Sequence, residues 1–331
     1  MAPDRRQELI AAWLRERAGL AGARLRPVSG DASFRRYYRV TTPAASYILM
    51  DAPPEQEDCR PFVRITGVLE GAGLHVPHLF EVDLDQGLLL LEDLGDAVML
   101  GHLREGEADR LYRQALEALC RIQLIGDAGL PHYDRALLMR EMGLFRDWFL
   151  GVHLGLELSP EQGAVLEAAF EALTRVAAEQ PQVFVHRDYH SRNLMLSGNN
   201  RLGILDYQDA VMGPIAYDLV SLLRDSYVCW PRERVVHWIG LYLEQARAAG
   251  LPVPGDAEAL LRWFELTGAQ RQLKVCGIFA RLHHRDGKPG YLKDIPRTFG
   301  YLMEATARHP ETQALHRLLC ELGIGTRLGV T

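Results

Sequence analysis

The stretch VHRDYHSRNLM, residues 185–195, places one aspartate between two histidines and an asparagine five positions later. His186, Arg187, Asp188 and Asn193 follow the pattern H-R-D-x-x-x-x-N, which is typical of a loop that transfers phosphoryl groups. In such a loop the aspartate accepts the proton of the acceptor hydroxyl, and the asparagine binds a magnesium ion. The stretch therefore predicts Asp188 as the catalytic base and Asn193 as a metal ligand.

This chemistry needs a second metal-binding carboxylate, because magnesium prefers hard oxygen ligands and bridges the charged oxygens of the phosphate donor. The sequence LGILDYQD, residues 202–209, supplies Asp206 directly after a short apolar run. Asp209 follows three residues later and is either a further ligand or a turn residue. A chance match explains neither the histidine two positions before Asp188 nor the aspartate that ends the next strand. The pattern favours phosphoryl transfer.

The hydrophobic pattern changes along the chain and indicates two lobes. Strands are expected over residues 36–40, 46–50, 78–82, 87–91, 182–185, 194–196 and 202–205. The first two are separated by a turn with Pro43 and predict a hairpin, and a helix is expected over 60–70. Beyond Asp96 helical periodicity prevails. The sequence predicts an α+β fold with a small β-rich lobe and a larger, mostly helical lobe. The family resemblance given below implies that the first is an antiparallel-sheet lobe that binds nucleotide (1–91), followed by a hinge (92–95) and a helical catalytic and substrate-binding lobe (96–331).

Composition narrows the class of protein. The 331 residues carry a formal charge of −6, which argues against a nucleic-acid partner. The sequence has neither a signal-peptide pattern nor an apolar run of membrane length, so a cytoplasmic protein without a membrane partner is expected. The cysteines are odd in number and form no C-x-x-C pair, which argues against a disulfide framework. We expect a monomer.

The catalytic loop resembles that of the aminoglycoside phosphotransferase and choline-kinase-like superfamily, whose pattern is roughly H-x-D-[LY]-H-x-x-N. His190 stands where protein kinases usually carry lysine. GPIAYDLVSLL, residues 213–223, is also similar, and its Asp218 corresponds to a buried aspartate that braces the loop through backbone amides. The resemblance implies a two-lobed protein-kinase-like fold with Mg²⁺ and ATP as cofactors. Only about ten residues separate Asp206 from this helix, which implies a small-molecule acceptor instead of a peptide.

The resemblance also implies where the nucleotide binds. LLLLEDLGD, residues 88–96, corresponds to the hinge whose backbone meets adenine, and SGDASFRRYYRV, residues 29–40, corresponds to the loop over the phosphates. The residues implied in nucleotide binding are Ser29, Gly30, Ser33, Arg35, Glu92, Asp93 and Leu94.

One element of the kinase pattern is missing. Kinases place a phosphate-binding lysine on the third strand, but Met50 occupies that region and no lysine precedes Lys274. We expect an arginine to supply the positive charge, although a guanidinium is larger and differently hydrated. The candidates are Arg35, Arg36 and Arg39.

The acceptor is indicated by a narrower resemblance. The segments SGDASFRRYYRV, LLEDLGD, GLFRDWFL and GIFARLHHRDGKPGYLKDIPR are similar to those of the anomeric sugar kinases of bacterial cell-wall (peptidoglycan) recycling. These enzymes phosphorylate N-acetylmuramate and N-acetylglucosamine at the C1 hydroxyl, so an amino-sugar acceptor is implied. The candidate substrate residues are His190, Arg146, Asp147, Trp148 and Arg281.

The charge distribution agrees with an acidic sugar. Residues 271–297 hold seven lysines and arginines against two aspartates, which suits the carboxylate of N-acetylmuramate. Aminoglycosides and choline are cations and call for an acidic pocket. Two alternatives remain open: a kinase for aminoglycosides or other amino alcohols and sugars, and a pseudokinase-like binding protein. The missing lysine favours the second alternative, but the intact Asp188, Asn193 and Asp206 oppose it.

Overall fold

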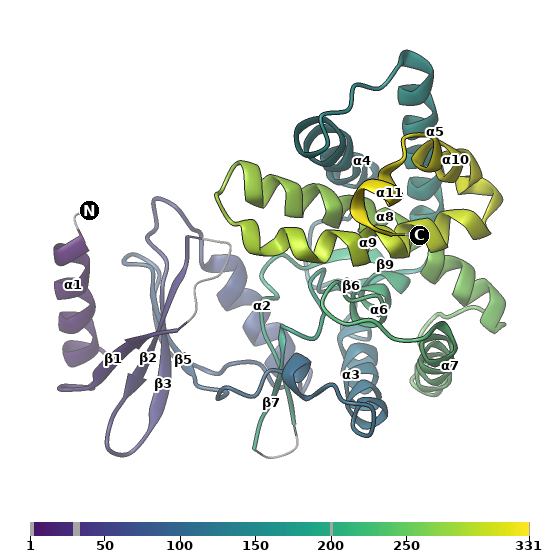
Figure 1. The fold of residues 1–331 in the computed structure, drawn as a ribbon. Coiled ribbons are helices and arrows are strands. Elements are labelled where there is room, and N and C mark those ends of the chain that lie inside the picture. Colours follow the sequence, from purple (N-terminus) through teal and green to yellow (C-terminus); the bar gives the residue numbers. More distant parts are fainter. Residues whose placement is uncertain (1–2, 29–33, 199–200, 331) are drawn as a thin grey trace. The chain divides into compact units, whose positions relative to one another are not determined.

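The computed structural model describes residues 3–28, 34–198 and 201–330. The chain forms two compact units, which are described separately (Figure 1). The first comprises Met1–Ala97 and Met195–Gln208, and the second comprises Val98–Leu194 and Asp209–Thr331. Asp206 therefore belongs to the first unit, whereas Asp188 and Asn193 belong to the second. The hinge expected at residues 92–95 stays a prediction.

The first unit contains an antiparallel sheet of five described strands in the order β1-β2-β3-β5-β4. Its strands are β1 (Arg24–Pro27), β2 (Arg36–Thr41), β3 (Ser46–Asp51), β4 (Leu79–Asp83) and β5 (Leu88–Glu92). The predicted hairpin is confirmed, because Arg36 of β2 lies opposite Asp51 and Thr41 lies opposite Ser46. The edge strand β1 was not predicted, since all four of its residues are exposed and show no alternation.

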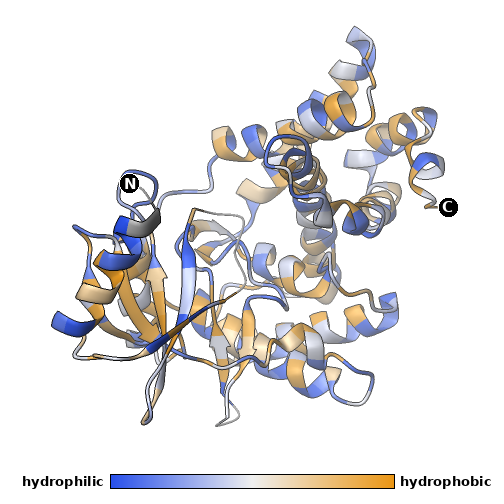
Figure 2. Ribbon diagram, turned by 60° about the vertical axis from the view of Figure 1, so that its left-hand side comes forward, coloured by the Kyte–Doolittle hydropathy of each residue, from blue (hydrophilic) through white to orange (hydrophobic). Residues whose placement is uncertain are grey.

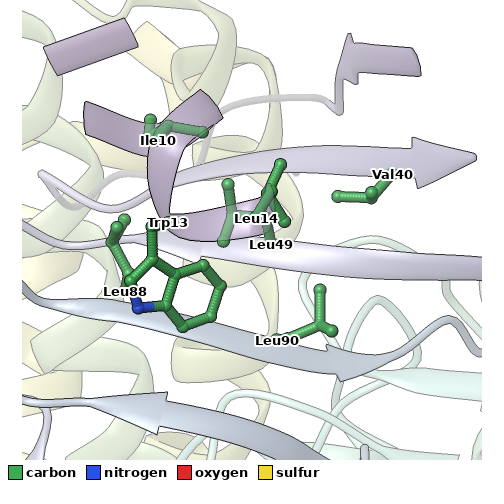
Figure 3. Close-up of a cluster of buried hydrophobic side chains, with 7 residues drawn as sticks. All are labelled: Ile10, Trp13, Leu14, Val40, Leu49, Leu88 and Leu90. Carbon is green, nitrogen blue, oxygen red and sulfur yellow. The ribbon is translucent and has the colours of Figure 1, made fainter. Parts of the chain in front are cut away.

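Helix α1 (Pro3–Glu16) packs on one face of this sheet. The cluster between them is formed by Ile10, Trp13, Leu14, Val40, Leu49, Leu88 and Leu90 (Figure 3). Because successive strand residues point to opposite faces, Met50 and Leu89 face away from α1 and are fully buried on the other side. The third strand is thus buried on both faces around Met50, which leaves that position apolar.

Helix α2 (Arg60–Gly71) confirms the helix predicted over 60–70. Pro61 stands in its first turn, where a missing N–H costs nothing. A small hairpin of β7 (Leu194–Leu196) and β8 (Leu202–Ile204) precedes Asp206. The backbone of Ile204 donates to the His75 carbonyl (2.9 Å), so this hairpin is joined to the segment that follows α2.

The second unit is mostly helical, as predicted. Its helices are η1 (Met99–His102), α3 (Ala108–Gln123), α4 (Arg135–Leu144), η2 (Phe145–His153), α5 (Pro160–Glu179), α6 (Ala216–Leu223), α7 (Arg232–Ala248), α8 (Ala257–His284), η3 (Pro289–Asp294), α9 (Ile295–Arg308), η4 (Pro310–Thr312), α10 (Gln313–Glu321) and α11 (Ile324–Leu328). Strand β6 (Gln182–Val185) pairs antiparallel with β9 (Val211–Pro214). Hydrophilic and hydrophobic residues alternate along many of these helices, as in amphipathic helices that cover a core (Figure 2).

Helix α8 is the central element of the second unit and packs against α4, α5, α6, α9 and η2. Gly277 makes the approach of α8 to α4 possible, because a Cβ there would lie 2.4 Å from the carbonyl carbon of Leu144. Directly after α4, the backbone continues as the π-helix η2, a rare conformation that often accompanies functional sites. None of the helices that the structure describes is long and apolar enough to span a bilayer.

Candidate active site

The predicted catalytic loop begins where β6 ends, and Asp218 of α6 holds its first residues. The backbone N–H groups of His186 and Arg187 donate to the two carboxylate oxygens of Asp218, at 2.6 and 3.0 Å. Asp218 is fully buried, and burial raises the pKa of its carboxyl to about 7, against the effect of the two donors. These contacts confirm the bracing role implied for Asp218.

Arg187 adopts a left-handed backbone conformation with a φ of 77°, which costs about 1–3 kcal/mol for a residue with a Cβ atom. Several contacts hold it there. Its side chain forms an ion pair with Glu141 of α4 and donates to the Asp209 carbonyl (3.3 Å), and its own carbonyl accepts from Ser221 Oγ (3.2 Å). This fixed conformation determines where the next side chain, Asp188, points.

The rest of the loop is fixed by short hydrogen bonds. The backbone carbonyl of Asp188 accepts from the His190 N–H and from Asn193 Nδ2, both at 3.0 Å. Ser191 donates to Asp225 through its backbone N–H (3.0 Å) and its hydroxyl (2.5 Å), and both residues are buried. The structure therefore brings Asp188, His190 and Asn193 together in one rigid loop, as the sequence motif predicted.

Asp188 is surrounded by positive charge. Its partial burial works to raise the pKa of the carboxyl, but nearby cations outweigh it and hold that pKa below its usual value. The groups that act on it are Lys274, His190, Arg187 and Arg271. Lys274 is itself buried and lies 3.3 Å from Glu141. Asp188 is thus a carboxylate at neutral pH, which a proton acceptor must be.

Aromatic rings follow on the His190 side of the loop. His190 contacts Tyr227 edge to face, with ring centroids 5.4 Å apart, and Phe279 and Tyr291 continue the row at 6.4 and 5.3 Å. The guanidinium of Arg192 lies 3.7 Å from the Tyr227 ring centroid. Burial lowers the pKa of His190, so its imidazole is neutral at physiological pH. These ring faces can pack against a sugar ring, and they can also attract a cation.

In the first unit, Asp206 is positioned by the residue that follows it. Tyr207 is fully buried, stacks on Phe62 of α2 (5.1 Å) and shares a 2.8 Å hydrogen bond with Thr66. Asp206 has a φ of 64° and accepts from Gln208 Nε2 at 2.8 Å. Anchoring Tyr207 to α2 therefore fixes the backbone that carries this carboxylate.

The residues expected near adenine also belong to the first unit. Glu92 lies 3.2 Å from His75, and Asp93 accepts from Ser46 Oγ (2.5 Å) and the Gly95 N–H (3.0 Å). Leu94 packs closely on β8, because a Cβ at Gly203 would lie 2.7 Å from its Cδ1. These side chains are engaged within the unit, and the expected contact of this segment with adenine stays a prediction. Ser29, Gly30 and Ser33 lie outside the described residues.

The three arginines considered for the missing lysine have different partners. Arg36 pairs with the buried Asp51 (2.6 Å), and Arg39 pairs with Asp93 (2.7 Å). Both guanidinium groups are therefore occupied by ion pairs with carboxylates of the first unit.

Arg35 differs from these two. It is 8 % exposed, lies 3.4 Å from Glu57 just before α2, and its charge interacts with that of Asp206. The charge of Arg35 thus acts on the expected metal ligand.

The expected substrate residues of the second unit are not all together. Arg146, Asp147 and Trp148 lie on η2, where Arg146 pairs with Asp147 (2.8 Å) and with Glu167 of α5 (2.5 Å). None of the interactions described for the chain joins Arg146 to Asp188. Arg281 is half-buried near the end of α8. Their roles in substrate binding stay predictions.

Sequence reasoning missed Glu141, which accepts from Tyr133 and Arg187 and pairs with Lys274. It also missed Asp225, and it considered Arg271 and Lys274 only as members of the basic segment 271–297. Both fall within residues 264–277 of α8, which are buried on every side of the helix. A charge in such a helix must be paired or functional.

Comparisons with known proteins show which family the chain resembles. Residues 24–264 match the Phosphotransferase enzyme family. The chain is 52 % identical to an N-acetylmuramate/N-acetylglucosamine kinase of Pseudomonas aeruginosa, over 92 % of this chain and 90 % of that protein. It is 46 % identical to a protein of the same name from Pseudomonas putida, over 98 % of each.

A solved structure of a choline kinase from Streptococcus pneumoniae has a TM-score of 0.63 at 14 % identity, covering 90 % of this chain and 99 % of that one. This likeness confirms the protein-kinase-like fold that was predicted. Together with the braced loop around Asp188, the sequence match over residues 24–264 shows that the chain belongs to the Phosphotransferase enzyme family.

Proposed function

We propose that this protein is an ATP-dependent kinase that phosphorylates the C1 hydroxyl of N-acetylmuramate and N-acetylglucosamine in peptidoglycan recycling. The observation that carries the proposal is the 52 % and 46 % identity, over nearly the whole chain, to two proteins named as kinases of these sugars. The neutral His190 and the aromatic row beside it offer ring faces on which a sugar ring could pack. ATP as the phosphate donor supports a cytoplasmic location.

In the proposed reaction, Asp188 orients the anomeric hydroxyl and accepts its proton. A bond forms between the sugar O1 and the γ-phosphorus of ATP, the bond from that phosphorus to the bridging oxygen breaks, and the products are the sugar 1-phosphate and ADP. An anomeric hydroxyl is more acidic than an ordinary alcohol, so a carboxylate with a lowered pKa is a sufficient base. The contacts of Arg187 and Asp218 hold Asp188 in place for this step.

Asn193 of the second unit and Asp206 of the first each offer an oxygen atom of the kind that magnesium binds. Asn193 uses its amide nitrogen on the Asp188 carbonyl (3.0 Å), which leaves the amide oxygen as the coordinating atom. Asp206 offers a carboxylate. Magnesium would neutralise charge on the phosphates of ATP. On the protein side, Arg35 would add a positive charge near Asp206.

The proposal is tested by incubating the protein with Mg-ATP and a panel of N-acetylmuramate, N-acetylglucosamine, kanamycin and choline. ADP release gives the rate, and the ³¹P chemical shift of the product identifies an anomeric phosphate. Asp188→Asn should lower kcat on the amino sugars by about 10²–10⁴-fold while sparing nucleotide binding. Turnover of kanamycin or choline without turnover of either amino sugar would reject the proposed acceptor.

A further inference from the structure

Arg271 of α8 is a buried cation without a carboxylate partner. It is 3 % exposed, and within the described part of the chain its guanidinium makes a hydrogen bond only from Nε, to Ser221 Oγ (2.8 Å). Its Nη1 atom is buried and has no partner among the described residues. Arginine cannot give up its proton to escape this environment. Since an unpaired buried charge destabilises a fold, its presence points to a negatively charged ligand.

Half of the other six cations of residues 271–297 are in ion pairs: Lys274 with Glu141, Arg285 with Asp286, and Arg297 with Asp294. Arg281 also has a buried Nε atom without a described partner. However, it lies ten residues further along α8, about 15 Å along the helix axis from Arg271. Arg271 is therefore a buried cation of this segment that forms no ion pair among the described residues, although its charge acts on Asp188 and Asp218 of the loop and its brace.

Arg271 lies on the side of the catalytic loop that carries His190, where the sugar acceptor is proposed to bind. Its charge interacts with those of Asp188, His190 and Tyr227. A sugar whose C1 hydroxyl meets Asp188 would lie against His190 and Tyr227, so its ring substituents would face α8. The lactyl carboxylate of N-acetylmuramate is attached through O3, two ring carbons from C1, and is a substituent within reach of such a cation.

We propose that Arg271 binds the lactyl carboxylate of N-acetylmuramate and makes the site favour this sugar over N-acetylglucosamine, which carries no carboxylate. This inference rests on the proposed function. Ser221 fixes the guanidinium through Nε, which leaves the Nη edge for the ligand. A planar guanidinium held in this way presents parallel N–H donors that match a carboxylate.

The test compares kcat/KM for the two sugars in wild type, Arg271→Gln and Arg271→Lys at pH 8, where Asp188 is ionised with or without the charge of Arg271. A charged hydrogen bond contributes about 1.5–3 kcal/mol, so Arg271→Gln should lower kcat/KM for N-acetylmuramate about 10- to 100-fold and change that for N-acetylglucosamine less than about threefold. Arg271→Lys should give an intermediate loss, because it keeps the charge and loses the planar donor pair. Arg285→Gln is the matched control, since Arg285 is exposed and pairs with Asp286; it should leave both values unchanged.

The methyl ester of N-acetylmuramate tests the same contact without relying on a variant that folds. Wild type should lose its preference for the acid when the carboxylate is esterified, and Arg271→Gln should not distinguish acid from ester. An equal loss on both sugars, or equal rates of wild type on acid and ester, would refute the role of Arg271 while leaving the proposed function intact. Wild type without turnover of either sugar would reject the proposed function itself.

Discussion

The contacts of Asp218 lead to a prediction about the bracing of the catalytic loop. Asp218→Asn replaces two acceptor oxygens by one oxygen and one NH₂ group, while the N–H groups of His186 and Arg187 still point at the side chain. One of these buried N–H groups loses its acceptor and faces another donor. An unsatisfied buried donor costs about 1–3 kcal/mol, which sets the expected loss of stability.

The loss should depend on pH, because burial raises the pKa of Asp218 to about 7. A folded-state pKa above the unfolded value of about 3.9 means that this group stabilises the wild type at low pH, and the contribution fades as pH rises through 7. Between pH 5 and pH 8 the wild type should lose about 2–3 kcal/mol from Asp218 alone. Asparagine does not titrate, so the deficit of the variant should be larger at pH 5 than at pH 8.

Thermal unfolding followed by circular dichroism at pH 5 and pH 8 measures this difference, and kcat at pH 8 measures the effect on the loop. A displacement of Asp188 by about 1 Å would lower kcat about 100-fold. Asp256→Asn is the control, because Asp256 caps α8 at an exposed site where asparagine caps equally well. The reasoning fails if Asp218→Asn behaves like this control, or if its deficit grows between pH 5 and pH 8.

Three further substitutions test other parts of the site and fold. Arg35→Met should raise the KM for ATP and lower kcat, measured by ADP release, with Arg35→Lys recovering part of the loss and the exposed Arg24→Met showing none. Lys274→Met removes a charge that lowers the pKa of Asp188, so the acid limb of the kcat/KM profile should move to higher pH. Gly277→Ala should destabilise the protein by about 1–3 kcal/mol in a melt, whereas alanine at Gly240, which has open space, should not.

The catalytic loop could be predicted because its chemistry requires particular residue types at short, fixed spacings. Asp188, Asn193 and Asp218 follow from one motif and one helix, and the contacts of Asp218 arise from residues only about thirty positions apart. The strands and helices could be predicted for a similar reason, because an element with one buried face carries apolar residues at a regular spacing. The edge strand β1 has no buried face, so its sequence shows no such regular spacing of apolar residues.

The environment of Asp188 could not be predicted, because it depends on which turns of distant helices meet. The sequence shows residues 271–297 only as one basic segment, whereas in the structure Arg271 and Lys274 are buried and the cations that follow are half-buried or exposed. Composition counts charges and says nothing of burial or pairing. The Glu141–Lys274 pair joins α4 and α8, which are over 130 residues apart in sequence, so no local sequence pattern predicts this ion pair.

The sequence shows that the phosphate-binding lysine is missing, but only the packing of the folded chain shows which cation could replace it. Met50 is enclosed on β3 between Tyr37 and Leu89, so a lysine there would need a buried counter-ion. Arg35 stands just before β2 and beside Glu57, which gives a cation–carboxylate pair next to the segment that enters α2. Because kinases use a lysine–glutamate pair in this role, a variant with Glu57→Gln should reproduce the nucleotide defect of Arg35→Met. If it does not, Glu57 only neutralises Arg35, and the charge of Arg35 acts on the nucleotide by itself.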